Sequence, residues 1–264
     1  MKDVCKNNGN NLLAADEPPA FTLVNAEGKS NVVLLCDHAS NRVPRGLNNL
    51  GLTNAQLEDH IGWDPGAVDV ARLLSQLLDA PLILSGYSRL VIDCNRPLHS
   101  AQLIPEQSGG VLVPGNQSLS NEDREQRVNE LFHPYHSAIN ELLSHRRTRA
   151  TRLLSIHSFT PNLQGQMRPW HIGISHWRND CLAALLIDAL KAVDNIVVGD
   201  NQPYAIDTEF DYAIPIHGEG RGLPSAMIEL RQDGIRTPEG VTRWAEVVAQ
   251  AYRKIEGLLL TARV

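Results

Sequence analysis

Three short apolar runs, each followed by a residue suited to chemistry, constrain the fold of this chain more than any other feature of its sequence. The runs are Val32 to Leu35, Leu153 to Ile156 and Ala226 to Ile228. They lead to His38, His157 and Glu229, and apolar runs of this length are typical of buried strands. In open α/β sheets, ligands bind at the carboxyl ends of the strands. The sequence therefore predicts one sheet edge at which two imidazoles and a carboxylate meet.

Helical patterns separate the predicted strands along the chain. The predicted strands cover residues 31–35, 81–84, 90–92, 151–156, 171–175, 195–198 and 225–230. The predicted helices cover residues 53–60, 67–78, 120–147, 179–193 and 238–259. Strands that alternate with helices indicate an α/β fold, and we expect a single-domain, three-layer α/β/α sandwich around a mostly parallel mixed sheet.

Two segments of the sequence have no regular pattern. Residues 1–18 are polar and aperiodic, so we expect a loose N-terminal arm before a single domain over residues 19–264. Residues 97–119 are rich in Pro, Gly, Ser and Gln and are predicted to form a long loop. Long structureless stretches inside a compact domain are more often functional flaps than filler.

Composition argues against several classes of function. The net charge is -6 and Lys and Arg form no extended cluster, so we expect no nucleic-acid partner. No apolar run approaches ~18 residues and the start of the chain lacks a secretory pattern, so we expect a cytoplasmic protein without a membrane partner. The four cysteines have no CxxC spacing, which argues against a thiolate zinc site. The expected partner is a small-molecule substrate, and the sequence does not indicate an oligomeric state.

The two histidines that follow predicted strands suggest a metal site. Neutral imidazoles are good zinc ligands, and a catalytic zinc typically takes three protein ligands and a water. The third ligand is open between two residues. Asn41 lies three residues after His38 but offers only an amide, whereas Asp64 is a carboxylate at a turn that enters a helix. Asp64 also fits the role of a helix cap, and a lone histidine such as His157 is often only a hydrogen-bonded structural residue.

Charged residues beside the same strands suggest roles in catalysis or binding. Glu229 follows three apolar residues, and a carboxylate there is costly to bury unless it is paired or functional. It is either a general base or one half of an ion pair with Arg231 or Arg89. Arg89 and Arg96 flank a predicted strand, and arginine suits bidentate recognition of a carboxylate.

A glycine-rich segment precedes the strand that carries Glu229. It reads Ile216-His217-Gly218-Glu219-Gly220-Arg221-Gly222. Because it follows no clean strand and opens no helix at the required spacing, it is not a dinucleotide-binding fingerprint. We expect it to bring His217 or Arg221 against the substrate.

Four stretches of the sequence together resemble the N-formylglutamate amidohydrolase family, part of the wider zinc carboxypeptidase and aspartoacylase group. They are Asp37-His38-Ala39-Ser40-Asn41-Arg42-Val43-Pro44, Ser88-Arg89 through Asn95-Arg96-Pro97, Ser155-Ile156-His157-Ser158 and Ile228-Glu229-Leu230-Arg231. The resemblance runs from about Val32 to Asp233. It implies a phosphorylase/hydrolase-like α/β/α sandwich that holds one zinc ion per chain.

The resemblance implies metal ligands as well. In the wider group the metal is held at the positions that are His38, Asn41 and His157 in this chain. The group has a glutamate where this chain has Asn41. We therefore expect Asp64 to supply the third ligand, together with His38 and His157.

The same resemblance implies the substrate-facing residues. Asn95 and Arg96 match a pair that grips the substrate α-carboxylate, Arg89 matches the arginine that polarises the scissile carbonyl, and Glu229 matches the catalytic glutamate. We expect zinc-dependent hydrolysis of an N-acyl amino acid, with N-formyl-L-glutamate giving formate and glutamate as the leading candidate. The alternatives are a deacylase or carboxypeptidase-like hydrolase of another small acyl-amino acid, and a non-catalytic protein that binds a carboxylate ligand on the same scaffold.

Overall fold

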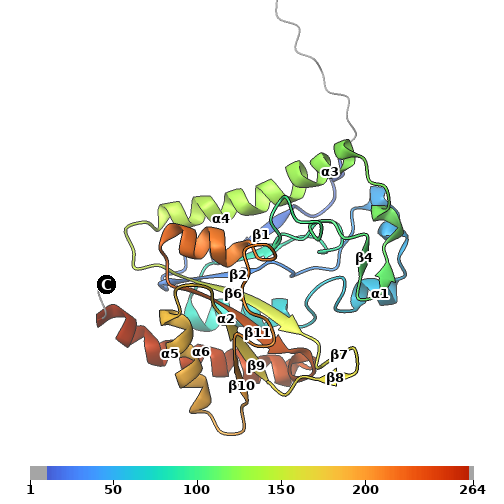
Figure 1. Cartoon of the computed structure of the whole chain (residues 1–264). Helices are drawn as coiled ribbons and strands as arrows, with labels where there is room; N and C mark the ends of the chain where they lie inside the picture. Colours follow the sequence, from blue (N-terminus) through green and yellow to red (C-terminus); the bar gives the residue numbers. More distant parts are fainter. Residues whose placement is uncertain (1–10, 262–264) are drawn as a thin grey trace, which may run out of the picture.

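A seven-stranded sheet forms the centre of the computed structural model, which describes residues 11–261 (Figure 1). The strands are ordered β1-β3-β2-β6-β11-β9-β10. Their bounds are β1 Phe21–Val24, β2 Val32–Cys36, β3 Leu82–Ser85, β6 Arg152–Phe159, β9 Ile172–Ser175, β10 Val198–Asp200 and β11 Ser225–Arg231. The four central strands β3, β2, β6 and β11 are parallel, whereas β1 and β9 run antiparallel to their inner neighbours. The predicted mixed α/β sheet is confirmed.

Helices cover both faces of this sheet (Figure 1). One face carries α2 (Ala67–Leu78), α5 (Cys181–Lys191) and α6 (Pro238–Thr261), and the other carries α4 (His133–His145) and the helical turn η4 (Ala213–Gly218). Side chains alternate along a strand, so β2 contributes side chains to the apolar cores on both faces of the sheet. Val32, Leu34 and Cys36 belong to the core under α2, α5 and α6. Val33 and Leu35 belong to the core under α4 and η4, which makes the fold the predicted three-layer sandwich.

The remaining regular elements are short and lie in the connections. They are α1 (Asn54–Glu58), α3 (Asn121–Arg127), the π-helical segment η3 (Val128–Phe132), the hairpins β4–β5 (Gln107–Ser108 and Val111–Leu112) and β7–β8 (Asn162–Leu163 and Gln166–Met167), and the 3-10 turns η1 (Arg45–Gly51), η2 (Pro114–Asn116), η5 (Glu219–Arg221) and η6 (Gln232–Ile235). The Ser120 side chain caps α3, accepting from the N–H of Asp123. The long helix predicted over residues 120–147 therefore exists as α3, η3 and α4 in succession.

The structure differs locally from the prediction in three places. Residues 90–92 form a buried turn instead of a strand, because the Val91 N–H bonds to the Ser88 carbonyl at 2.9 Å. Strand β1 was not predicted, because its residues are only partly buried and lack a clear apolar run. The loop of residues 97–119 is not structureless either. It contains β4–β5 and surrounds the buried Arg127, which donates to the carbonyl of Val91 and to the side chain of Asn116.

The predicted loose arm, residues 1–18, lies outside the described residues up to position 10. From residue 11 onward it contacts the domain. Leu12 is buried, and the N–H groups of Leu12 and Leu13 donate to the Glu130 carboxylate at 2.8 and 3.1 Å. Residues 11–18 are therefore held against the domain, which corrects the prediction for that part. Among the described residues, no helix combines the length and apolar character needed to cross a membrane.

Candidate metal centre and substrate cavity

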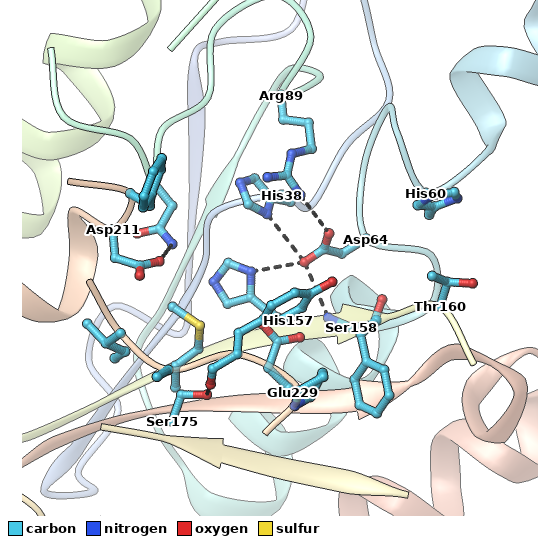
Figure 2. Close-up of a pocket in the computed structure, with 18 of the residues that line it drawn as sticks. His38, His60, Asp64, Arg89, His157, Ser158, Thr160, Ser175, Asp211 and Glu229 are labelled. Atoms are coloured by element: carbon cyan, nitrogen blue, oxygen red, sulfur yellow. Dashed lines mark hydrogen bonds and ion pairs between the residues drawn. The ribbon is translucent and has the colours of Figure 1, made fainter. Parts of the chain in front are cut away.

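Parallel strands bring the predicted site residues together at one edge of the sheet (Figure 2). His38 follows β2 by two residues, and His157 and Glu229 lie on adjacent strands at the same register position. Asp64 lies in the turn before α2, and its backbone N–H donates to the His38 carbonyl at 3.1 Å. Because carboxyl ends of parallel strands face the same way, residues far apart in sequence converge here.

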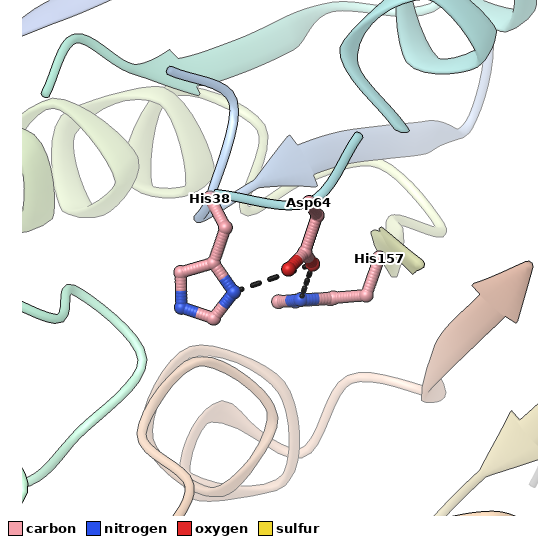
Figure 3. A group of neighbouring side chains, drawn as sticks. All are labelled: His38, Asp64 and His157. Carbon is pink, nitrogen blue, oxygen red and sulfur yellow. Dashed lines mark hydrogen bonds and ion pairs between the residues drawn. The ribbon is translucent and has the colours of Figure 1, made fainter. Parts of the chain in front are cut away.

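The Asp64 carboxylate lies between the two imidazoles (Figure 3). Its Oδ2 is 3.3 Å from His38 Nδ1 and 2.9 Å from His157 Nδ1. One ligand atom from each of the three residues lies within 4.8 Å of the others, and all three residues are buried. Two nitrogens and one carboxylate oxygen form a donor set that suits a catalytic zinc ion with an open position.

A second carboxylate backs each imidazole on the side away from Asp64. His38 Nε2 is 2.7 Å from Asp93 Oδ1, and His157 Nε2 is 3.0 Å from Asp37 Oδ2. A proton on each Nε2 then faces an acceptor and leaves the Nδ1 lone pair directed at the shared centre. Such carboxylate–histidine pairs orient the imidazoles of metal sites. The residues present thus fit a metal ion in both their donor atoms and their surroundings.

Sequence reasoning missed Asp37 and Asp93 as functional residues, although both lie inside the stretches that carry the family resemblance. Asp37 directly precedes His38, and Asp93 follows the apolar residues 90–92. Both are almost fully buried, and a buried acid needs a partner. Asp37 has further donors in the hydroxyls of Ser155, at 2.6 Å, and Tyr135, at 2.8 Å.

The acids and imidazoles of the centre shift one another's pKa values. Burial by itself raises the pKa of the Asp64 carboxyl, but the neighbouring His38 and His157 hold that pKa below its usual range. Burial also works against a charged His157, yet hydrogen bonds to Asp37 and Asp64 raise the pKa of this imidazole well above its usual value. Asp37, Asp64 and Asp93 therefore make a strongly negative environment that attracts positive charge.

The structure separates the two candidates for the third ligand. Asp64 is not a helix cap, because Gly66 occupies the N-cap of α2 and no side chain bonds there. The Asp64 carboxylate instead accepts from the Ser158 N–H at 3.2 Å and lies 3.5 Å from Arg89. Asn41 is half-buried and does not line the cavity described below. The arrangement groups Asp64, not Asn41, with the two histidines.

Glu229 is buried beside this centre without the ion pair that its structural interpretation requires. Arg231 pairs with Asp233 at 2.8 Å, and Arg89 pairs with Asp93 at 2.8 Å. The Oε2 atom of Glu229 has no hydrogen-bond partner among the described residues. Burial raises the pKa of the Glu229 carboxyl to about 7. A buried acid with an unused oxygen in a cavity is suited to proton transfer.

Two arginines and an asparagine from the loop after β3 also line the cavity. Arg89 donates to Asp93 Oδ2 through Nε at 3.1 Å and through a terminal nitrogen at 2.8 Å. Arg96 donates to the Phe210 carbonyl, and its Nε lies 3.9 Å from Asp93. The Asn95 side-chain oxygen accepts the N–H groups of residues 212 and 213 at 3.0 and 2.9 Å. Asn95 therefore anchors a neighbouring loop, which leaves Arg96 as the freer member of the predicted pair.

The predicted contacts of His217 and Arg221 with substrate are corrected by the structure, because neither residue lines the cavity. His217 is buried in η4, where its Nε2 is 2.8 Å from Nδ1 of His136 on α4. Arg221 is exposed and donates to Asn140 at 2.8 Å. The glycine-rich segment folds onto β11 on the face that α4 covers. A Cβ at Gly218 would lie 2.3 Å from Ser225 Oγ, which shows how closely the segment packs.

The centre opens into a cavity of about 480 Å³. This size suits a small molecule. The lining residues are His38, His60, Asp64, Arg89, Asn95, Arg96, His157, Ser158, Phe159, Thr160, Leu163, Ser175, Pro203, Tyr204, Ala205, Ile206, Asp207, Phe210, Asp211, Met227, Glu229 and Gln232.

One side of the cavity is formed by residues 202–212, which we call the wall loop. The Ser175 hydroxyl holds this loop by donating to the Tyr204 carbonyl at 2.6 Å. The loop also passes very close to Gly173, which lies opposite Glu229 in the pairing of β9 with β11. A Cβ at Gly173 would lie 1.9 Å from the Gln202 carbonyl oxygen, so only glycine permits this approach. The Ser175 bond and the close approach at Gly173 therefore hold the start of the wall loop against the sheet, and Asn95 holds its end.

Comparisons with known proteins show the family and the fold of the chain. The model of the N-formylglutamate amidohydrolase family matches residues 30–236. A gene product of Agrobacterium tumefaciens has a crystal structure with a TM-score of 0.87 and 33% identity, over 93% of this chain and 100% of that one. The N-formylglutamate amidohydrolase of Ralstonia eutropha JMP134 shares the fold, with a TM-score of 0.72 and 19% identity over 92% of this chain and 99% of that one. No curated protein matches the sequence. The chain belongs to the N-formylglutamate amidohydrolase family.

Proposed function

We propose that this protein is a zinc-dependent amidohydrolase that cleaves the amide bond of an N-acyl amino acid. His38, Asp64 and His157 would hold one zinc ion per chain. The observation that carries the proposal is the shared Asp64 carboxylate between two imidazoles, each backed by a second acid, with an unpaired Glu229 in the same cavity. The family name makes N-formyl-L-glutamate, giving formate and glutamate, the leading candidate substrate.

The proposed chemistry divides between the ion and the residues of the chain. When bound, zinc supplies Lewis-acid catalysis, polarising an amide carbonyl and lowering the pKa of water to roughly 7. Glu229, whose pKa burial raises to about 7, takes a proton from the attacking water on its free Oε2 and delivers it to the leaving amide nitrogen. Arg89 lies beside Asp64 and supplies positive charge where negative charge develops on the carbonyl oxygen.

Substrate orientation falls to Arg96 in this proposal. Its guanidinium lines the cavity, and its two nearest carboxylates, Asp93 and Asp211, are each 3.9 Å away. Because those ion pairs are long, Arg96 has to give up only its hydrogen bond to the Phe210 carbonyl to bind an incoming α-carboxylate through parallel hydrogen bonds. Binding of the α-carboxylate by Arg96 thereby fixes which end of the substrate faces the metal centre.

The proposal is tested by measuring formate and acetate release from N-formyl and N-acetyl amino acids, with metal content determined on the same preparation. We expect about one zinc per chain, turnover that chelation abolishes, and recovery on adding zinc back. Retention of an unchanged acyl-amino acid, with no release by the zinc-loaded protein, would instead identify a carboxylate-binding protein. The predicted cytoplasmic location stays a prediction.

A further inference from the structure

We propose that the Tyr204 hydroxyl, polarised by the Arg168 guanidinium behind it, binds the side-chain carboxylate of a dicarboxylic N-acyl amino acid and selects that class of substrate. The proposal rests on the hydrolytic function proposed above, with the substrate α-carboxylate on Arg96. Tyr204 belongs to the wall loop and lines the cavity, and Arg168 directly follows the β7–β8 hairpin. The two residues together present a buried cation and a cavity-lining hydroxyl bonded to it.

Arg168 is a buried cation whose charge is not balanced by an acid. Only 8% of the residue is exposed, and among the described residues its guanidinium forms no ion pair with a carboxylate. It donates to the Tyr204 hydroxyl at 2.9 Å and to the Thr160 carbonyl at 3.5 Å. Its central carbon lies 4.9 Å from the ring centroid of Tyr204 and 5.7 Å from that of Phe159. Because a buried charge without a counter-ion is costly, this position favours the binding of an anion nearby.

The hydroxyl of Tyr204 passes this positive charge on to the cavity. A guanidinium has only donors, so the phenolic oxygen accepts the bond from Arg168 and its own hydrogen remains to be donated. No group among the described residues accepts that hydrogen, and Tyr204 is 44% exposed. Consecutive hydrogen bonds polarise one another, and a carboxylate acceptor makes the last bond charge-assisted. The arrangement therefore suits a carboxylate better than an apolar group at this place.

Tyr204 and Arg168 are both held by bonds other than the one between them. The Ser175 hydroxyl donates to the Tyr204 carbonyl at 2.6 Å. The Arg168 N–H donates to the Pro161 carbonyl at 2.9 Å, and the Arg168 carbonyl accepts from Arg231 at 3.1 Å. A hydroxyl fixed from both ends needs little rearrangement when a ligand binds, which reduces the cost of binding.

The other cationic side chains of the cavity are already engaged. Arg89 donates twice to Asp93, and His60 has its Nδ1 2.8 Å from the Asp59 carboxylate. Arg96 takes the α-carboxylate in the proposed binding mode. Of the positive charges at or directly behind the described lining residues, the charge of Arg168 is the one left for a second carboxylate.

The acids of the wall loop are grouped at its other end. Asp211 accepts from Asn95 at 3.1 Å and from the Asp207 N–H at 2.9 Å, and it lies 3.9 Å from Arg96 (Figure 2). Tyr204 instead lies at the end that Ser175 holds. The two ends of the loop thus differ in charge, which gives the substrate side chain a direction within the cavity.

The first test compares N-formyl-L-glutamate, N-formyl-L-glutamine and N-formyl-L-norleucine, which have side chains of similar size, on the zinc-loaded full chain. We expect kcat/KM to fall in that order, with glutamate about tenfold or more above norleucine. Norleucine turned over as efficiently as glutamate would overturn this inference and leave the proposed function standing.

Variants separate recognition by the hydroxyl from support of the wall. Tyr204→Phe keeps the ring, so it should raise KM for glutamate about tenfold and leave norleucine within about twofold. Arg168→Gln should likewise reduce the glutamate-to-norleucine ratio, and Arg168→Lys, which retains the charge, should preserve more of it. Tyr252→Phe is the matched control, because Tyr252 lies on α6 and does not line the cavity. Equal losses on glutamate and norleucine in Tyr204→Phe would overturn the inference.

Binding measured by calorimetry makes the inference testable apart from hydrolysis. N-formyl-L-glutamate should bind about tenfold more weakly to Tyr204→Phe than to the unmodified protein, and N-formyl-L-norleucine should bind equally to both. Absence of turnover with all three substrates would overturn the proposed function, and equal binding of N-formyl-L-glutamate to both proteins would overturn the inference.

Discussion

Two pairs of buried histidines lie in this protein at almost the same spacing and in opposite surroundings. The rings of His38 and His157 are 4.9 Å apart, and those of His136 and His217 are 5.1 Å apart. In the first pair every ring nitrogen faces a carboxylate. In the second pair the two rings bond to each other at 2.8 Å, and aromatic rings such as Tyr212 surround them.

The surroundings move the pKa values of the two pairs in opposite directions. Although burial opposes it, Asp37 and Asp64 raise the pKa of His157 well above the usual value. Burial lowers the pKa of His136 to about 3 and that of His217 to about 4. The comparison teaches that two buried imidazoles do not make a metal site by themselves. Acids placed on both sides of each ring distinguish the candidate centre from a structural pair.

The largest expected difference between the two histidine pairs is the effect of their mutation on zinc content. His157→Ala and Asp64→Ala should reduce zinc from about one per chain to near zero, because each removes one of the three proposed ligands. His217→Ala, the matched change in the other pair, should retain zinc, and so should Asn41→Ala. Elemental analysis of the four purified variants measures this. Zinc lost from Asn41→Ala but kept in Asp64→Ala would assign the third ligand to Asn41.

The second difference between the pairs is the free acid that only the first has beside it. Glu229→Gln should keep zinc and the fold but lower kcat by about 10²–10⁴, since glutamine preserves the shape and cannot transfer the proton. The ratio of kcat to bound zinc in one preparation gives the result. A kcat close to that of the unmodified protein would return Glu229 to a structural role.

The third expectation concerns the acids behind the rings. Asp93→Asn should weaken zinc affinity about 10–100-fold, because an amide orients the His38 ring but does not supply the negative charge. The measurement is competition with a chelator of known affinity. Glu130→Gln is the control and should leave zinc affinity unaltered. The Glu130 carboxylate accepts from the N–H groups of residues 12 and 13 and is not part of the candidate centre.

The smallest effect is expected in the structural pair and appears as stability. His217→Leu should lower the free energy of unfolding at pH 7 by about 1–3 kcal/mol, because it leaves the buried His136 Nδ1 without its partner. The loss should shrink between pH 7 and pH 5. The unfolded chain takes up a proton on His217 below its usual pKa of 6.5, while the folded protein stays neutral there down to about pH 4. Protonation of His217 in the unfolded chain therefore lowers the free energy of unfolding of the unmodified protein by up to ~1.4 kcal/mol per pH unit as the pH falls. The variant has no imidazole at this position and does not lose this stability. Urea unfolding at both pH values tests this, and an unchanged difference would contradict it.

The fold could be predicted from sequence largely because its central strands are apolar on both faces. Runs such as Val32–Cys36 and the amphipathic helix Ala67–Leu78 carry their structure in their own residues. Leu90 to Ile92 also form an apolar run but pack as a turn into a separate core beneath the connecting loops. Short apolar runs report burial reliably and conformation less so, because a buried turn needs the same side chains as a buried strand.

Residues of the candidate site could be predicted where a chemically suitable side chain also lies at the end of an apolar run in the sequence. His38, His157 and Glu229 each follow or end an apolar run, and a carboxylate, which offsets a metal charge better than an amide does, favours Asp64 over Asn41. Asp37 and Asp93 were missed because their roles depend on partners distant in sequence. His217 was misassigned for the related reason that a glycine-rich segment does not reveal on which face of the sheet it folds.

The contact between Gly173 and the wall loop has a consequence for how this cavity can change. Any side chain at position 173 would have to displace the Gln202 carbonyl, and the loop bearing Tyr204 and Phe210 would move with it. The width of the cavity therefore depends on position 173, where the absence of a Cβ lets the wall loop approach the sheet, although Gly173 itself does not line the cavity. Mutations that redirect specificity without touching the metal centre have one obvious place to begin, on the far side of the wall.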